Sequence, residues 1–129
     1  MNEPDWLTRE QCAEMHDRQL ALYGGLAGIR DEGLLDSALN RPRQLFSFGN
    51  PAVSELATAY AFGIAKNHPF LDGNKRVALM AALFFLESNG FRFNGSVDEA
   101  SVFTRKLADG SMSEGAYCEW LTARSEEIK

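Results

Sequence analysis

One short turn of the sequence holds the residue types that proton transfer and metal binding require. His68 stands four residues before Asp72, and Pro69 and Gly73 shape the backbone around them. Imidazole titrates near neutral pH and can take a proton from an attacking hydroxyl, whereas an ionised carboxylate can hold the Mg²⁺ that bridges nucleotide phosphates. The pair therefore has the chemistry of a general base and a metal ligand.

The residues after this turn break a local preference of helices. A helix N-terminus carries partial positive charge and favours acidic residues, yet the helix expected here opens with Lys75 and Arg76. A polyanion would explain the two cations, because exposed backbone N–H groups bind anions and Gly73 permits close approach. The pattern favours a phosphate-binding site.

Each of these residues also has an ordinary structural explanation. A histidine before proline is usually a loop residue, Asp72-Gly73 is a common turn dipeptide, Asn74 is an ordinary N-cap, and Lys-Arg is usually solvated. Their joint occurrence before a long apolar helix is less ordinary. The residue chemistry alone leaves both phosphate binding and a plain structural turn open.

The elements that position this turn are predicted to be helices. All ten residues from Val77 to Leu86 are apolar, which predicts a helix buried on nearly all sides and ended by Asn89-Gly90. A buried strand is the alternative, but the Ala and Met content and the length favour a helix. We expect an all-α fold, a compact bundle of about six helices around this buried central helix, with residues 1–129 as a single domain.

The other boundaries are predicted from caps and breakers. The segment 43–49 is expected to be a loop, 91–93 a short extended piece, and Cys12 and Cys118 small core residues. His16 is interpreted as a partly exposed structural residue. Three helices are expected to begin at capping boxes: Thr8–Gln11, with an end at Gly24-Gly25; Ser96–Glu99, with an end at Gly110; and Ser111–Glu114. Two more are expected from Asp31 to Arg41-Pro42 and from Asn50-Pro51 to about Lys66.

Composition excludes several classes of function. The formal charge of -5 argues against a protein that neutralises nucleic-acid phosphates with clustered cations. No run approaches the roughly 18 apolar residues of a membrane span, and residues 1–5 lack the order of a signal peptide. We expect a cytoplasmic protein that binds neither nucleic acid nor membrane.

The stretch 68–76, His-Pro-Phe-Leu-Asp-Gly-Asn-Lys-Arg, closely resembles the HxFx(D/E)GN(G/K)R motif of the Fic superfamily, in its branch of death-on-curing (Doc) toxins. Residues 28–42 also resemble the Doc pattern, and the likeness covers roughly residues 7–121. It implies a small helical bundle that binds ATP and Mg²⁺. The roles it implies are His68 as general base, Asp72 as Mg²⁺ ligand, Phe70 as apolar anchor, and Gly73, Asn74, Lys75 and Arg76 as the phosphate-binding residues.

Two positions separate the chain from the AMP-transferring members of that superfamily. Lys75 stands where those enzymes carry glycine, and Leu79 where they carry a second arginine. Both are typical of Doc toxins, in which the γ-phosphate faces the attacking hydroxyl. The resemblance thus implies a type II toxin that phosphorylates a Thr or Ser of elongation factor Tu and arrests translation. The alternatives are AMP transfer and an inactive helical binding module.

The resemblance also implies a second chain that controls activity. Fic proteins that inhibit themselves carry an (S/T)xxxE(G/N) helix. The two Glu-Gly pairs of this chain do not match it, because Gly28 and Gly110 stand four residues before Glu32 and Glu114, where the motif requires Ser or Thr. Inhibition is therefore expected from a Phd-like antitoxin acting through its C-terminal segment. The aromatic segment with Phe46, Phe48 and Gly49 falls where the family places its target-docking flap.

Overall fold

The computed structural model describes residues 3–128, in which six helices and a two-stranded sheet are defined, and it confirms the all-α fold class. Among these residues, no helix is long and apolar enough to cross a membrane. The elements are α1 (Arg9–Tyr23), α2 (Glu32–Ser47), α3 (Val53–Asn67), α4 (Asn74–Ser88), β1 (Phe91–Phe93), α5 (Val97–Asp109), α6 (Glu114–Ala123) and β2 (Ser125–Glu127).

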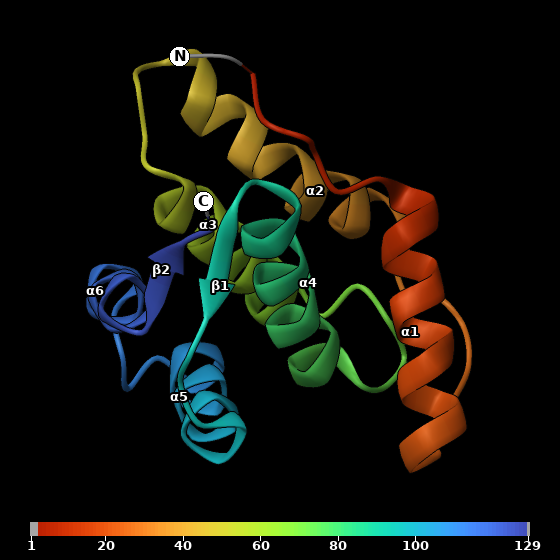
Figure 1. The fold of residues 1–129 in the computed structure, drawn as a ribbon. Helices are drawn as coiled ribbons and strands as arrows, with labels where there is room; N and C mark the ends of the chain where they lie inside the picture. Colours follow the sequence, from red (N-terminus) through yellow and green to blue (C-terminus); the bar gives the residue numbers. More distant parts are fainter. Residues whose placement is uncertain (1–2, 129) are drawn as a thin grey trace.

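The core is built around α4 and its neighbour α3. Helix α4 packs against α3, α1, α5 and β1, and lies in Figure 1 between α1 on one side and α5 and α6 on the other. Seven of the ten residues in its apolar run are buried, and Phe84 is the one that reaches the exposed class. Helix α3 is buried to a similar degree, because its small residues let α2, α4, α5 and α6 approach.

Helix α2 continues past the predicted stop at Arg41-Pro42. Asp31 caps its start as expected, but the helix includes Pro42 and ends at Ser47, so most of the predicted loop 43–49 is helical. Proline removes one backbone hydrogen bond and normally breaks a helix. Here its ring is buried and α2 packs extensively along α3, so tertiary packing outweighs the local preference.

Two helix starts also differ from the capping expectations. Helix α3 begins two residues later than Asn50-Pro51 implies, with Ala52 as N-cap and the Glu55 side chain accepting from the Ala52 N–H. Helix α6 is capped by Ser113, which accepts from the Ala116 N–H, and not by Ser111. The capping box at Thr8 and Gln11 and the Ser96 cap of α5 are as predicted.

The remaining small predictions have mixed outcomes. The extended piece Phe91–Phe93 is β1, which pairs antiparallel with β2, a strand that the sequence analysis missed. Cys12 lies in the core, where burial raises the pKa of its thiol to about 11. Cys118 is only half-buried, so its placement in the core was wrong.

A close contact between α2 and α3 fixes the frame that carries the turn after α3. A Cβ added at Gly63 would lie 3.1 Å from the Cα and 3.2 Å from the Cβ of Ala38. Both residues are buried, so neither helix can give way without disturbing the core. Glycine at this position lets the two helices pack closely.

We predict that Gly63→Ala lowers the free energy of unfolding by about 1–3 kcal/mol, because overpacking forces the two backbones apart. Urea denaturation followed by circular dichroism measures the change. Gly115→Ala is the matched control, since it is also helical but has no atom within 4 Å of an added Cβ. That variant should gain a few tenths to about 1 kcal/mol from helix propensity alone, and equal effects of the two substitutions would contradict the packing argument.

Candidate functional site

The turn between α3 and α4 begins at a strained histidine. His68 has φ 49° and ψ 56°, and it is the one residue other than glycine with positive φ among residues 3–128. This left-handed conformation costs a residue with a Cβ about 1–2 kcal/mol. The His68 N–H donates to the Ile64 carbonyl oxygen, so α3 ends there and the chain reverses. His68 is exposed at the helix end. The connection from α3 to α4 is the light-green segment that reaches toward α1 in Figure 1.

The amide of Asn74 holds the turn closed. Its Oδ1 accepts from the Phe70 N–H at 2.9 Å, and its Nδ2 donates to the Phe70 carbonyl oxygen at 3.0 Å. Asn74 is buried, so its side chain replaces water as the hydrogen-bond partner of both the N–H and the carbonyl of Phe70. The two bonds fix the amide orientation and place Nδ2 3.4 Å from Nδ1 of His68, a long contact that holds the imidazole only weakly. Any phosphate contact of Asn74 is therefore left to its backbone N–H.

A second histidine supports the turn from α1. His16 stacks on Phe70 with ring centroids 4.0 Å apart, and its Nε2 donates to the Asp72 carbonyl oxygen at 2.9 Å. Both residues are buried, at 3% and 1% exposure, so the expectation that His16 is partly exposed was wrong while its structural role stands. The spacing contained this information, because His16 lies four residues after the buried Cys12 on the same helix face.

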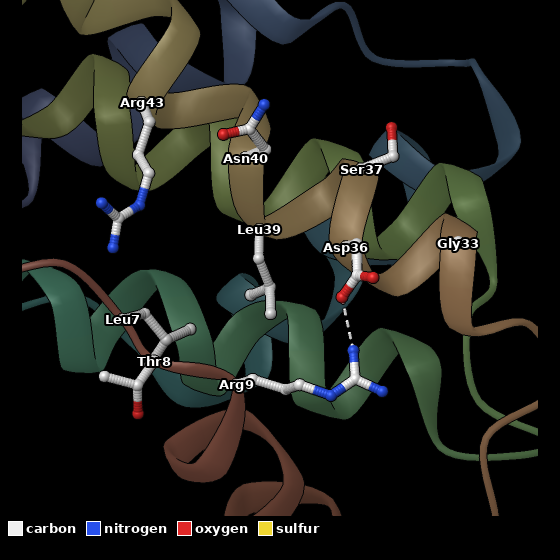
Figure 2. Close-up of a pocket in the computed structure, with 9 residues that line it drawn as sticks. All are labelled: Leu7, Thr8, Arg9, Gly33, Asp36, Ser37, Leu39, Asn40 and Arg43. Atoms are coloured by element: carbon white, nitrogen blue, oxygen red, sulfur yellow. Dashed lines mark hydrogen bonds and ion pairs between the residues drawn. The ribbon is translucent and has the colours of Figure 1, made fainter.

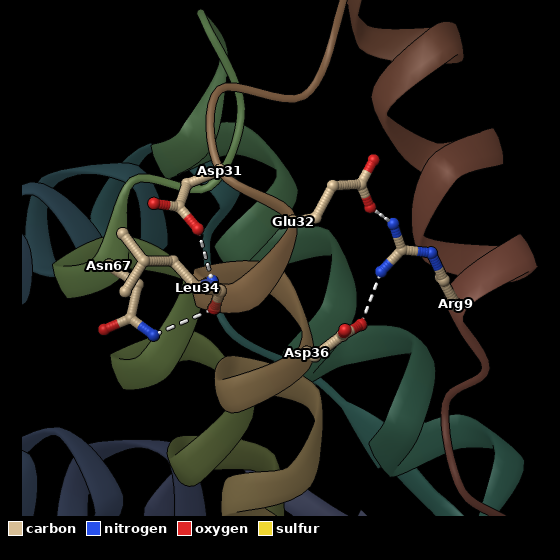
Figure 3. A network of polar contacts seen from close by, with 6 residues as sticks. All are labelled: Arg9, Asp31, Glu32, Leu34, Asp36 and Asn67. Carbon is tan, nitrogen blue, oxygen red and sulfur yellow. Dashed lines mark hydrogen bonds and ion pairs between the residues drawn. The ribbon is translucent and has the colours of Figure 1, made fainter.

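The segment before α2 lies antiparallel to the turn. Ile29 and Phe70 form a β-bridge, the Leu71 N–H donates to the Gly28 carbonyl oxygen, and the N–H groups of Arg30 and Asp31 share the Pro69 carbonyl oxygen. Figure 3 shows how the start of α2 is tied further, through the Asp31 cap on the Leu34 N–H and the bond from Asn67 to the Leu34 carbonyl oxygen. In the same view Arg9 pairs with Glu32 and Asp36 and joins α1 to α2.

Arg30 is a residue of the site that sequence reasoning left out. Its Nε donates to the His68 carbonyl oxygen at 2.7 Å and its Nη2 to the Asn67 carbonyl oxygen at 2.8 Å. The side chain therefore covers the C-terminal end of α3, where carbonyl groups lack helical partners. No local pattern indicates this role, because the contacts join residues 37 and 38 positions apart in the sequence.

The Asp72 carboxylate is exposed and oriented by backbone groups. Its Oδ1 accepts from the Gly73 N–H at 2.9 Å and its Oδ2 from the Leu26 N–H at 3.3 Å. Gly25, at φ 121°, lies so close that an added Cβ would be 2.8 Å from Oδ2. Within residues 3–128 no group of three His, Cys, Asp or Glu side chains could hold a metal ion. One oriented carboxylate fits Mg²⁺, which typically binds one or two carboxylates, waters and substrate phosphates.

Helix α4 starts differently from the other five helices of residues 3–128. Each of those carries an acidic residue in its first turn, whereas α4 carries none there and has no side-chain cap. Its N-cap is Gly73, in the left-handed conformation with φ 77°. Lys75 and Arg76 are both exposed in this first turn, and the Arg76 guanidinium carbon lies 4.3 Å above the Tyr23 ring centroid. The helix dipole and both side chains concentrate positive charge here.

These residues line one cleft of about 620 Å³ between the end of α1, the turn, α4 and α5. Its charged lining consists of three cations and a single carboxylate, in a chain of net charge -5. Its apolar lining comes mainly from Leu79, Met80 and Leu83 of α4. The lining residues are Gln19, Tyr23, His68, Leu71, Asp72, Gly73, Asn74, Lys75, Arg76, Leu79, Met80, Leu83, Val97, Ser101, Thr104 and Arg105.

A different hollow lies between the start of α1 and the outer face of α2. Figure 2 shows Arg9 reaching across this hollow to Asp36, so two of the charged side chains that line the hollow already pair with each other. None of the turn residues 68–74 lines this hollow. The cleft at the start of α4 is therefore the one that unites the residues singled out from the sequence.

The aromatic segment predicted as a flap is not brought to His68. Phe46 belongs to the last turn of α2 and packs edge-on against Trp6, while Phe48 is 88% exposed. With Gly49 they precede the start of α3, whereas His68 follows its end, and a 15-residue helix is about 20 Å long. The segment that does lie against the turn is 24–31.

We predict that Asn74→Ala lowers the free energy of unfolding by about 1–3 kcal/mol, because it leaves the buried N–H and carbonyl of Phe70 without partners. Chemical denaturation measures this loss. Asn40→Ala, an exposed position on α2, is the control and should change stability by less than about 0.5 kcal/mol. A neutral Asn74→Ala variant would show that the turn does not depend on this amide.

Comparisons with known proteins agree with this arrangement. The chain is 30% identical over 116 residues to "Protein kinase doc" of Escherichia phage P1, covering 89% of this chain and 91% of that protein. It is 42% identical over 79 residues to "Toxin Doc" of Mycolicibacterium smegmatis, covering 59% and 60% of the two chains. The model of the Fic/DOC family matches residues 6–86, which include α1 to α3, the whole turn and all but the last two residues of α4. The chain therefore belongs to the Fic/DOC family.

Proposed function

We propose that this protein is the toxin of a type II toxin–antitoxin system and acts as a protein kinase. It transfers the γ-phosphoryl group of ATP to a Thr or Ser hydroxyl of a translation factor. The name of the phage P1 relative, "Protein kinase doc", and that of the mycobacterial relative, "Toxin Doc", support the assignment. The reaction would take place in the cytoplasm, where translation occurs.

The start of α4 is the observation that carries this proposal. It is the one helix start in residues 3–128 with no acidic first turn and no side-chain cap, and it adds two exposed cations to free backbone N–H groups. A structural helix start would gain stability from an acidic residue there. Its absence, beside an exposed histidine and a carboxylate in the same cleft, fits a site for a polyphosphate.

The placement of these groups supports the following chemistry. The neutral imidazole of His68 takes the proton of the acceptor hydroxyl as its oxygen attacks the γ-phosphorus. A new P–O bond forms, the bond from the γ-phosphorus to the bridging oxygen breaks, and ADP leaves with the bridging oxygen. Lys75, Arg76 and the N–H groups of the first turn of α4 stabilise the charge on the phosphate oxygens.

Asp72 would hold Mg²⁺ through its carboxylate, and the ion would neutralise part of the phosphate charge. The Leu26 and Gly73 N–H groups keep this carboxylate at the mouth of the cleft. The carboxylate also limits the excess positive charge of the lining. This balance suits a metal-bound nucleotide better than a free anion.

We propose elongation factor Tu as the target, with a threonine as the acceptor, so that phosphorylation arrests translation. The bulky cation at Lys75, on the exposed face of the helix start, supports transfer of phosphate over transfer of AMP, which would need close backbone approach at this position. The rival functions, AMP transfer and a purely binding module, give different adducts or none.

Inhibition by a Phd-like antitoxin is part of the same proposal. Large apolar side chains are exposed around the cleft, with Tyr23 at 61%, Leu71 at 51% and Val97 at 66% exposure. A folding C-terminal segment of a partner chain would bury them. The absence of an (S/T)xxxE(G/N) sequence in this chain agrees with control from outside.

We expect the wild-type protein to add one phosphate, and not AMP, to elongation factor Tu in the presence of ATP and Mg²⁺. His68→Asn should slow transfer by about 10²–10⁴-fold, because it removes the base while asparagine tolerates the left-handed backbone. Intact-protein mass spectrometry of the target measures both. His68→Ala should behave alike, and unimpaired transfer in either variant would remove His68 from the mechanism.

We expect Asp72→Ala to abolish the Mg²⁺ dependence of ATP binding, because the Asp72 carboxylate is the one charged ligand that the cleft offers to Mg²⁺. Titration calorimetry with ATP, with Mg²⁺ and with EDTA, measures the effect. The control is Asp17→Ala, an exposed aspartate on α1 outside the cleft. If Mg²⁺ strengthens ATP binding equally in all three proteins, Asp72 is not the ligand.

A further inference from the structure

We infer that Arg30 is a positioning residue for His68: its guanidinium holds the end of α3 in the strained geometry that presents the imidazole to the cleft. This inference rests on the proposed function of His68 and adds a residue outside the 68–76 motif. Arg30 lies in the segment before α2, and it does not line the cleft.

The contacts of Arg30 act at the strained residue itself. Its Nε binds the His68 carbonyl oxygen at 2.7 Å and its Nη2 binds the Asn67 carbonyl oxygen at 2.8 Å. The planar guanidinium thus joins two successive carbonyl groups across the point where φ changes sign. A cation is also favourable here, because the C-terminus of α3 carries partial negative charge.

The backbone around Arg30 gives the side chain a fixed base. The Arg30 N–H donates to the Pro69 carbonyl oxygen at 2.7 Å, and the neighbouring Ile29 pairs with Phe70. Main chain and side chain of Arg30 therefore bind three successive carbonyls, those of Asn67, His68 and Pro69. In contrast, among residues 3–128 the His68 ring makes one polar contact, the long one to Asn74. The orientation of the imidazole thus depends chiefly on its backbone.

The test compares Arg30→Met and Arg30→Lys with Arg18→Met, a matched exposed arginine that pairs with Glu14 on its own helix. Steady-state transfer from ATP to elongation factor Tu should show kcat lowered by at least about tenfold in Arg30→Met, since small displacements of a base are costly. KM for ATP should stay within about twofold, and Arg30→Lys should recover part of kcat because one ammonium still reaches a carbonyl.

A second readout does not need activity. The chain has two histidines, so ¹³C,¹⁵N-histidine labelling gives one reporter, His68, and one internal control, His16. In Arg30→Met the backbone and ring resonances of His68 should shift away from their left-handed values, while those of the buried His16 stay in place. Arg18→Met should shift neither.

Three outcomes overturn the inference. Unchanged kcat and unchanged His68 resonances in Arg30→Met would show that Arg30 does not position the histidine. A raised KM for ATP with normal kcat would make Arg30 a nucleotide contact. Shifts at both histidines with no recovery by Arg30→Lys would indicate a general loss of structure. If the wild-type protein transfers no phosphate, the proposed function fails, and the histidine resonances alone still decide the role of Arg30.

Discussion

The site depends on the bonds between one buried amide and the two backbone groups of Phe70. Without them, the turn would bury an N–H and a carbonyl with no partners, at a cost comparable to a fair part of the stability of a small domain. With them, α4 begins at Asn74 and not elsewhere. The directions of the Lys75 and Arg76 side chains, and of the backbone N–H groups in the first turn of α4, follow from that starting point. A residue assigned to phosphate binding thus serves first as the fastening of the turn.

Much of this architecture could be predicted because its determinants are local. Caps, apolar periodicity and the His68-Pro69 break identify all six helices, and nine ordered residues identify the turn. The failures arise where distant segments decide. Burial against α3 keeps Pro42 inside a helix, and pairing between Ile29 and Phe70 brings 24–31 to the turn. Neither effect is visible within a window of a few residues, and the contact of Arg30 with the end of α3 is of the same kind.

The cleft carries positive charge although the chain as a whole is acidic. The chain is acidic, yet the cleft lining gathers Lys75, Arg76 and Arg105 beside one carboxylate. Acidic first turns on the other helices of residues 3–128 stabilise those helices, whereas α4 forgoes this gain. Burial of most of its apolar run compensates for the weak start, because packing supplies far more free energy than a cap. A deeply buried helix is therefore suited to carry an unfavourable N-terminus.

The position of Arg76 over the Tyr23 ring would limit how that arginine can contact the proposed phosphate. An aromatic ring engages the flat face of a guanidinium, while the N–H donors of the group point outward along its plane. Tyr23 therefore restricts the tilt of the group without occupying a single donor, and it lowers the rotational freedom that binding would otherwise have to remove. If Arg76 binds phosphate as proposed, the last residue of α1 would limit the directions from which the phosphate oxygens can approach the guanidinium.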